Sequence, residues 1–352
     1  MLSAVHICAH NAKNAGDLYL ALSVKKVFER KFGKIKWTDF DIQKLCTESD
    51  IDLFNNNDMI IVGGGGHIAI NSFYYKKETG WSLGLPNSLL SKIKPPLIGY
   101  AIGYNLFRGE VMNNDIFTSN ISNILNRFDF FSLRHQGDIE KLKKILPQKR
   151  NISFNFCSSL VNDKYDHNNS DKIVFQLAWD ATEKRFGTKK NIETFIENIN
   201  VIAKYFSNEG MKVNLVSHTN RDIPIDLRIF DNWKQSKIHC KYISLVNAEP
   251  NKTSDFYYGV NTVFAMRGHS QMIPLGLGCN VVSLISHDKV KCLLEDLNIE
   301  KTGVEVNDND FLKKCFNAYE IAQKTDFNSK LDIVRDNIDD NMSKIKNIIK
   351  EI

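Results

Sequence analysis

The tripeptide Arg267-Gly268-His269 joins an anion-binding side chain to one that can move a proton. Arginine is permanently charged and grips phosphate or carboxylate with a planar fork of N–H donors. Histidine exchanges a proton near neutral pH, although a lone histidine is more often structural. Both residues follow the apolar run Thr262–Ala265, and Lys289 lies just beyond the next apolar run. Catalytic groups gather at such strand ends, so we expect Arg267, His269 and Lys289 to be catalytic and Gly268 to contact substrate.

A second candidate segment, Asn14-Ala15-Gly16-Asp17, follows the first apolar run and opens the first predicted helix. The start of a helix presents free N–H groups and the positive end of the helix dipole, which suit an anion. Asn14 and Asp17 are therefore candidate substrate-binding residues, and Asp17 is a weak candidate for a base. The alternative is that Asp17 only caps the helix, which is the common use of Asp at that place.

Four consecutive glycines, Gly63 to Gly66, end the apolar run that begins at Met59 and precede His67. Glycines at a strand end let the backbone approach a ligand closely, so Gly64, Gly65 and His67 are candidate substrate-binding residues. His67 is also a weak candidate for a base. The spacing matches neither the P-loop nor the dinucleotide-binding pattern, so it predicts no nucleotide. A plain tight turn is the alternative.

Arg134 follows the apolar run 128–133. Open α/β sheets bind ligands at the carboxyl ends of their strands, which makes Arg134 a further candidate catalytic cation. A surface salt bridge explains this residue equally well.

These residues need a scaffold in which many strands end at one edge, and the sequence predicts one. Short, continuous apolar runs alternate with segments of helical period, as in a parallel sheet covered on both faces. The helical segments include Leu18–Phe32, Ile139–Leu146 and the stripe that runs from Ile192 to Phe206. The expected strands are Ala4–Ala9, Ile35–Phe40, Met59–Val62, Leu97–Ile102, Phe128–Leu133, Ile173–Leu177, Val213–Val216, Tyr242–Val246, Thr262–Ala265 and Val281–Ile285.

The polar segment 162–171 separates two such series of strands and helices, and a chain of 352 residues is long enough for about two domains. We therefore expect an α/β fold with two Rossmann-like domains, residues 1–165 and 166–352, facing across a cleft. The apolar stripe from Leu331 to Ile352 predicts a long amphipathic helix at the C-terminal end of the second domain. Its lysines could contact lipid, but packing into the core is the commoner use of such a stripe.

Composition narrows the class of protein. The chain is 43% hydrophobic and 25% charged, which is typical of a globular protein. Its net charge of +5 is too small to indicate a nucleic-acid partner. It contains neither an apolar stretch long enough to span a membrane nor a basic leader segment. The seven cysteines are scattered without a C-x-x-C pair, which fits a reducing compartment. We expect a cytoplasmic protein and no structural metal site.

At these segments the chain resembles the polysaccharide pyruvyl transferase family. Asn14-Ala15-Gly16-Asp17 is similar to the family's N-terminal Asn-x-Gly-Asp motif, and Gly63-Gly64-Gly65 and Gly99–Gly103 to its next two strand ends. Arg134 lies where the family has an arginine before a short helix. The family's Arg-Leu-His motif is represented by Arg267-Gly268-His269, and its Tyr-x-x-Lys pattern by Ser286-His287-Asp288-Lys289. Gly268 and Ser286 replace the usual Leu and Tyr, and this departure concerns the choice of acceptor more than the anion-handling residues.

The resemblance implies a GT-B-like architecture and transfer of pyruvate from phosphoenolpyruvate to two hydroxyls of a sugar, giving a cyclic ketal and phosphate. Phosphoenolpyruvate is then the donor substrate, and no cofactor is implied; metal dependence is left open. Arg134, Arg267 and Lys289 would neutralise the donor, with Gly103 among the substrate-binding residues. His269 would be the general acid, either protonating C3 or assisting the departure of phosphate.

The acceptor implied is a sugar of a cell-surface polysaccharide, such as a capsule or exopolysaccharide, or of its lipid-linked precursor. A lipid-linked acceptor would place the enzyme at the inner face of the membrane. Two alternatives remain open from the residues alone: a nucleotide-sugar glycosyltransferase of similar fold, and a non-catalytic glycan-binding protein. The sequence leaves the oligomeric state undetermined.

Overall fold

The computed structural model describes residues 1–69, 81–110, 115–146, 152–162 and 170–350. The expected domain boundary at residues 165 and 166, and most of the expected linker, lie outside these residues. The chain forms two compact units: unit 1 comprises Met1–Asn11, Leu20–Ser158 and Ile333–Ile352, and unit 2 comprises Ala12–Tyr19 and Ser159–Asp332.

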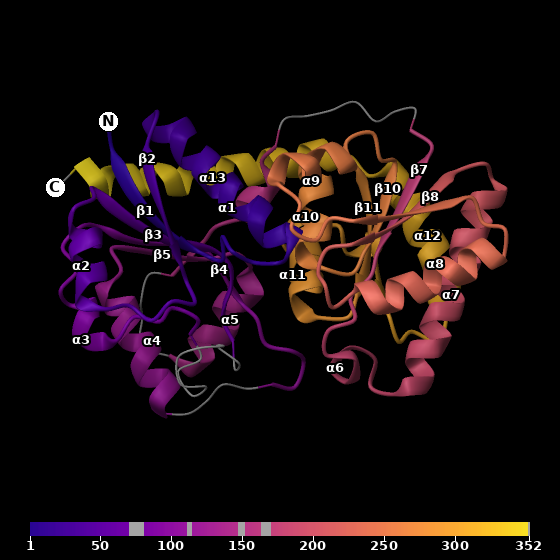
Figure 1. Cartoon of the computed structure of the whole chain (residues 1–352), viewed down its shortest axis with the longest axis horizontal. Helices are drawn as coiled ribbons and strands as arrows, with labels where there is room; N and C mark the ends of the chain where they lie inside the picture. The colour runs from indigo at the N-terminus through magenta and orange to yellow at the C-terminus, as the bar shows by residue number, and fades with distance from the viewer. Residues whose placement is uncertain (70–80, 111–114, 147–151, 163–169, 351–352) are drawn as a thin grey trace. The chain divides into compact units, whose positions relative to one another are not determined.

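Unit 1 is built on a parallel sheet of six strands in the order β2-β1-β3-β4-β5-β6. Its central strands β1, β3, β4 and β5 are almost entirely buried, as expected for a parallel sheet with helices on both faces (Figure 1). The strands are β1 Ser3–Cys8, β2 Lys36–Asp41, β3 Met59–Ile68, β4 Leu97–Tyr104, β5 Phe130–Leu133 and β6 Ser153–Phe154. The helices are α1 Ala15–Phe32, α2 Glu48–Asn55, α3 Asn87–Leu90, α4 Asp115–Arg127 and α5 Gln136–Ile145, followed by the 3₁₀ turn η1 Ser158–Leu160.

Unit 2 repeats this plan with six parallel strands in the order β12-β11-β10-β7-β8-β9. Because β10 lies between β7 and β11 and runs parallel to both, the segments that follow these three strands begin at the same edge of the sheet. The strands are β7 Lys172–Gln176, β8 Lys212–Ser217, β9 Cys240–Ser244, β10 Thr262–Ala265, β11 Asn280–Ile285 and β12 Gly303–Glu305. The helices are α6 Thr182–Phe186, α7 Lys189–Asn208, α8 Ile223–Gln235, α9 Pro250–Tyr257, α10 Gly268–Gly276, α11 Asp288–Leu297 and α12 Phe311–Lys324, with the 3₁₀ turn η2 Glu300–Thr302. The last helix, α13 Phe327–Lys350, begins in unit 2 and continues into unit 1.

The predicted fold class is confirmed, since both units are α/β with a parallel sheet in the strand–helix order that the sequence indicates. Two strands were not predicted: β6 has two residues and β12 has three, too few for an apolar pattern. The prediction that the glycines Gly63 to Gly66 follow the end of their strand is wrong. These glycines lie inside β3, whose register with β4 shifts between Gly65 and Ile68.

The two units divide the chain differently from the predicted residues 1–165 and 166–352: residues 159–162 already belong to unit 2, and two more distant segments change unit as well. Ala12–Tyr19 belongs to unit 2, because the Ala15 amide donates to the His218 carbonyl at 3.1 Å and Asn14 bridges to Thr219. The C-terminal part of α13 belongs to unit 1. Both assignments depend on contacts between segments that are far apart in sequence, which no local pattern reveals.

Helix α13 packs inward, as its apolar stripe predicts. Its buried side chains are Leu331, Val334, Ile338, Met342 and Ile345. Two of its asparagines also bond to strand β6: the side-chain amides of Asn337 and Asn341 donate to the Phe154 carbonyl at 3.2 and 2.8 Å. The helix therefore covers the short edge strand of unit 1 and satisfies its backbone.

Candidate active site

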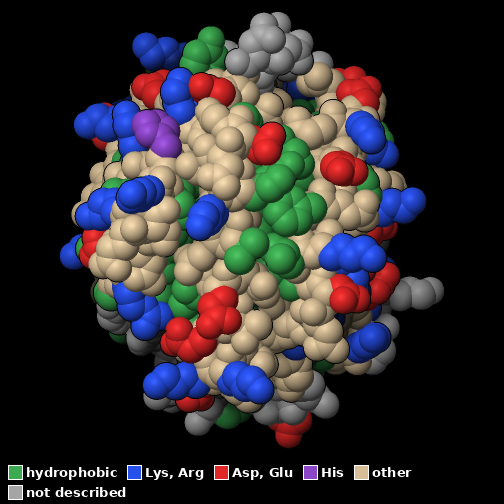
Figure 2. All heavy atoms as spheres, turned by 90° about the vertical axis from the view of Figure 1, so that its right-hand side faces the viewer, with side chains coloured by type: hydrophobic (Ala, Val, Ile, Leu, Met, Phe, Trp, Pro, Cys, Tyr) green, Lys and Arg blue, Asp and Glu red, His purple; other side chains and the backbone are tan. Residues whose placement is uncertain are grey.

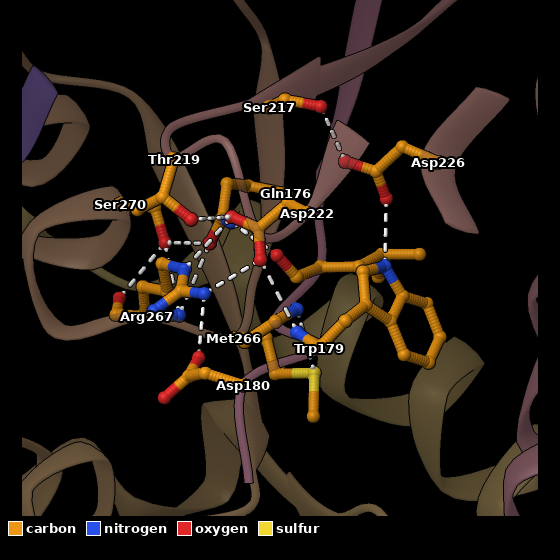
Figure 3. Close-up of polar contacts among 12 residues, drawn as sticks. Gln176, Trp179, Asp180, Ser217, Thr219, Asp222, Asp226, Met266, Arg267 and Ser270 are labelled. Atoms are coloured by element: carbon orange, nitrogen blue, oxygen red, sulfur yellow. Dashed lines mark hydrogen bonds and ion pairs between the residues drawn. The ribbon is translucent and has the colours of Figure 1, made fainter. Parts of the chain in front are cut away.

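Arg267 lies directly after β10 and is the N-cap residue of α10. Its backbone amide donates to the side-chain oxygens of Gln176, at the end of neighbouring β7, and of Ser270, both at 3.1 Å (Figure 3). Ser270 in turn donates to Gln176 at 2.6 Å. These bonds fix the main chain at the point where the strand becomes a helix, so the Arg267 side chain starts from a rigid position.

The Arg267 guanidinium is held by two carboxylates (Figure 3). It donates to both oxygens of Asp222, from Nε at 3.0 Å and from Nη2 at 2.6 Å, and Nη2 also lies 2.5 Å from Oδ1 of Asp180. The Asp222 side chain is 0% exposed and that of Asp180 is 20% exposed. Burial opposes the charged guanidinium, but the two carboxylates outweigh it and raise the pKa of Arg267. Arg267 is therefore a fixed cation with one buried partner and one more exposed partner.

A second arginine shares the exposed carboxylate. Arg185 is 2% exposed at its side chain, and its Nη2 donates to Asp180 Oδ2 at 2.9 Å while Nη1 donates to the Ser286 hydroxyl at 2.8 Å. Burial would raise the pKa of Asp180, but Arg267 and Arg185 outweigh it and lower the pKa. Ser286, which stands where the resembled motif has Tyr, therefore has a defined partner in Arg185.

Asp222 is held in turn by the residues around it. It accepts from the Thr219 hydroxyl at 3.1 Å and from the Trp179 backbone amide at 3.2 Å. The Trp179 indole donates to Asp226 at 2.8 Å, and Asp226 also accepts from the Ser217 hydroxyl at 2.6 Å. Burial raises the pKa of Asp226 to about 7. Figure 3 shows these groups as one network from Ser217 to Arg267.

His269 and Lys289 complete the predicted group of unit 2. His269 is in the first turn of α10, with its Nδ1 3.6 Å from Oδ1 of Asp17. Lys289 is in the first turn of α11, and its charge is one of those that lower the pKa of Asp180. Asn14 belongs to the same unit and donates to Asp17 at 2.9 Å. The structure therefore brings Asn14, Asp17, Arg267, Gly268, His269 and Lys289 together at the strand ends of unit 2.

The other predicted residues belong to unit 1 and have structural contacts there. The His67 ring nitrogen Nε2 lies 2.9 Å from the Gly64 carbonyl, and burial lowers the pKa of His67 to about 4. Gly64 has φ 76° and Gly65 φ 133°, and a Cβ on Gly65 would meet the His67 ring at 2.8 Å. The glycines therefore make room for a neutral, buried His67, which is a poor base at neutral pH.

Arg134 is buried at the end of β5, where its guanidinium lies against Gly103 of β4. A Cβ on Gly103 would come within 2.6 Å of Arg134 Nε, so the guanidinium fills the space that a side chain at position 103 would otherwise occupy. The charge of Arg134 is one of the factors that lower the pKa of His67.

Sequence reasoning missed Asp180, Arg185, Asp222 and Asp226. A signal for two of them existed: Asp180 and Asp222 follow the predicted strands 173–177 and 213–216 by a few residues, so both lie at the same sheet edge as Arg267. Arg185 and Asp226 are within helical segments, where charged residues are common, and no local pattern distinguishes them.

Unit 2 therefore gathers an arginine, a histidine and a lysine at the ends of parallel strands, where open α/β sheets commonly bind ligands. Residues 14–288 match the family model for polysaccharide pyruvyl transferase, so the chain belongs to the polysaccharide pyruvyl transferase family. The family is one of transferases whose acceptor is a sugar or polysaccharide. No curated protein matches the chain significantly.

Solved structures show the same fold at low sequence identity. A glycosyltransferase from Rickettsia africae ESF-5 superposes with a TM-score of 0.59 at 11% identity, covering 99% of this chain and 98% of that chain. The UDP-GlcNAc 2-epimerase from Methanocaldococcus jannaschii, solved in complex with UDP-GlcNAc and UDP, gives a TM-score of 0.53 at 12% identity, covering 95% and 98%. At these identities the likeness concerns the fold alone.

None of the described helices combines the length and apolar character needed to cross a bilayer. In the same part of the chain, no three His, Cys, Asp or Glu side chains form a group that could hold a metal ion.

The buried pair between Arg267 and Asp222 yields a first prediction. Replacing Asp222→Asn removes the charge that faces a buried guanidinium, so we expect a loss of about 3 kcal/mol in the free energy of unfolding, measured by urea denaturation. The control is Asp231→Asn, which removes the carboxylate of an exposed ion pair with Lys234 and should cost less than about 1 kcal/mol. Equal losses of unfolding free energy in the two variants would contradict the conclusion that Asp222 is the buried partner of Arg267.

Asp226 yields a prediction on pH dependence. Its pKa in the folded protein is about 7 against 3.8 in the absence of burial, so between these values the folded state binds the extra proton. The free energy of unfolding of the wild type should therefore fall relative to Asp226→Asn as the pH rises from about 4 to about 7, and level off above that. Urea denaturation at pH 4.5 and 7.5 measures this difference, and the same difference at both pH values would show that Asp226 is ionised throughout.

Proposed function

We propose that this protein transfers pyruvate from phosphoenolpyruvate to two hydroxyls of a sugar, forming a cyclic ketal and releasing phosphate. The observation that carries the proposal is the position of Arg267 and His269 at the start of α10, two residues apart and just beyond the end of β10, in a chain that belongs to the pyruvyl transferase family. One residue offers a fixed cation and the other a proton, and both are needed by this donor.

The charges around Arg267 suit a donor with two anionic groups. Arg267, Arg185 and Lys289 surround the Asp180 carboxylate, while Asp222 neutralises Arg267 from the buried side. Asp180 demonstrates that a carboxylate can lie between these arginines, and the carboxylate of phosphoenolpyruvate has the same charge and shape. Lys289 and the backbone N–H groups at the start of α11 would bind the phosphate of the donor.

The reaction balances with one proton donor and one leaving group. A sugar hydroxyl oxygen attacks C2 of the donor, and C3 takes up a proton, which turns the enol carbon into a tetrahedral centre. Departure of phosphate then creates oxocarbenium character at C2, which the second hydroxyl captures. Of the two hydroxyl protons, one leaves with phosphate and the other makes up, through solvent, for the proton that C3 has taken up. His269 protonates C3 or assists the departure of phosphate, and both roles require its imidazolium form.

The acceptor proposed is a sugar of a cell-surface polysaccharide, as in a capsule or exopolysaccharide, or of its lipid-linked precursor. Lipid-linked precursors are assembled at the cytoplasmic face of the inner membrane, so we place the enzyme in the cytoplasm with peripheral access to that face. Basic and acidic side chains are interspersed on the face in Figure 2, with apolar patches between them. We propose no cofactor.

Calorimetric titration with phosphoenolpyruvate tests the donor. We expect the wild type to bind it, and Arg267→Lys, which keeps the charge but loses the fork, to bind at least about tenfold more weakly. Arg267→Ala should abolish binding. The control Arg228→Ala removes an exposed arginine of α8 paired with Glu193 and should bind like the wild type. Binding of UDP-GlcNAc in place of phosphoenolpyruvate would favour the nucleotide-sugar glycosyltransferase instead.

A further inference from the structure

The Asn14–Asp17 segment, which begins α1 and is predicted to bind substrate, also contacts His269. Neither of those two roles explains this contact. A Cβ on Gly16 would come within 2.4 Å of Nδ1, 2.5 Å of Cβ and 2.7 Å of Cγ of His269. The imidazole and its stem therefore lie directly against the Gly16 main chain. Gly16 is not among the residues with positive φ, so this glycine is needed for space and not for backbone conformation.

Asn14 holds the Asp17 carboxylate in a fixed orientation. The Asn14 side-chain oxygen accepts from the Gly16 amide at 3.0 Å, which is the bond of a helix N-cap, and its Nδ2 donates to Asp17 Oδ2 at 2.9 Å. The cap of α1 is therefore Asn14 and not Asp17. The second oxygen of Asp17, Oδ1, is the one that lies 3.6 Å from His269 Nδ1.

The same segment is tied to the loop that follows β8. Asn14 bridges to Thr219, and the Ala15 amide donates to the His218 carbonyl. This loop also contains Asp222, the buried partner of Arg267. One loop of unit 2 therefore fixes both the carboxylate that holds Arg267 and the segment that faces His269.

We propose that Asp17 is a positioning residue for His269, and that Asn14 and Gly16 serve to seat the imidazole beside it. The inference rests on the proposed function, because it gives His269 a proton to deliver. A distance of 3.6 Å is too long for a hydrogen bond, so the interaction is one of charge and orientation.

The negative charge next to Nδ1 favours the forms of the ring that carry a proton there. In the neutral ring this leaves the lone pair on Nε2, and in the imidazolium it makes Nε2 the nitrogen that gives up its proton. A carboxylate that fixes the tautomer of a catalytic histidine does the same work in hydrolases with a Ser-His-Asp triad. Asp17 would therefore act through His269 and not as the base for the sugar hydroxyl.

Nitrogen NMR of protein labelled with ¹⁵N-histidine tests the tautomer without relying on activity. The His269 signals are assigned by their loss in His269→Gln. At a pH where the ring is neutral, we expect the wild type to show the tautomer protonated on Nδ1, and Asp17→Asn to shift the population toward the tautomer protonated on Nε2. The matched control is Asp115→Asn, which removes an exposed carboxylate from the first turn of α4 and should leave the His269 signals unchanged.

Steady-state kinetics of pyruvyl transfer give the second readout. We expect Asp17→Asn to lower kcat about tenfold or more while the KM for phosphoenolpyruvate stays within about twofold, because orientation of the acid affects the chemical step. Asp115→Asn should retain wild-type kcat and KM. A raised KM at unchanged kcat would mean that Asp17 contacts the donor, and would overturn the proposal.

The two readouts separate failure of this inference from failure of the proposed function. An unchanged tautomer in Asp17→Asn overturns the positioning role even where the wild type transfers pyruvate. If the wild type does not transfer pyruvate, the proposed function fails, and the tautomer populations still decide whether Asp17 positions His269.

Discussion

Asp222 is a buried carboxylate, and the Arg267 guanidinium that donates two hydrogen bonds to it keeps that charge compatible with the fold. Removing Arg267 would leave the Asp222 carboxylate as an uncompensated charge in a region of low dielectric constant, and removing Asp222 would leave the guanidinium with Asp180 alone; both are less favourable than the intact pair. The rest of the site follows from this constraint. Thr219 and the Trp179 amide hold Asp222 in place, and Asp180 and Arg185 complete the balance of charge on the more exposed side.

A network of this kind has a functional consequence beyond stability. Arg267 is held in one orientation by the protein itself, so under the proposed function no binding energy is needed to order it when the donor binds. The side chain of His269, two residues further on, packs against the main chain of Gly16, which restricts its orientation as well. Both supports depend on the short connection between β8 and α8, which provides a rigid base because a buried parallel sheet fixes where each strand ends.

The sequence predicts most of the fold because apolar runs of four to six residues mark the central strands of both sheets, and it fails at β6 and β12 because two or three residues carry no period. For the site, residue type and strand-end position are enough to select Arg267, His269 and Lys289. They do not show that Arg267 is paired with Asp222, because nothing in the sequence distinguishes Asp222 from the other aspartates of the chain. Asn14, predicted to bind substrate, also caps α1 and orients Asp17, a relation that only three-dimensional contacts reveal.

The central claim, that Arg267 receives the anionic donor while Asp222 keeps it oriented, is tested most directly by a crystal structure of the protein soaked with phosphoenolpyruvate. The account predicts a carboxylate or phosphate oxygen of the donor within hydrogen-bond distance of Arg267, with the two bonds to Asp222 retained and His269 beside the donor. Donor density elsewhere, with Arg267 still held by both Asp180 and Asp222, would contradict it.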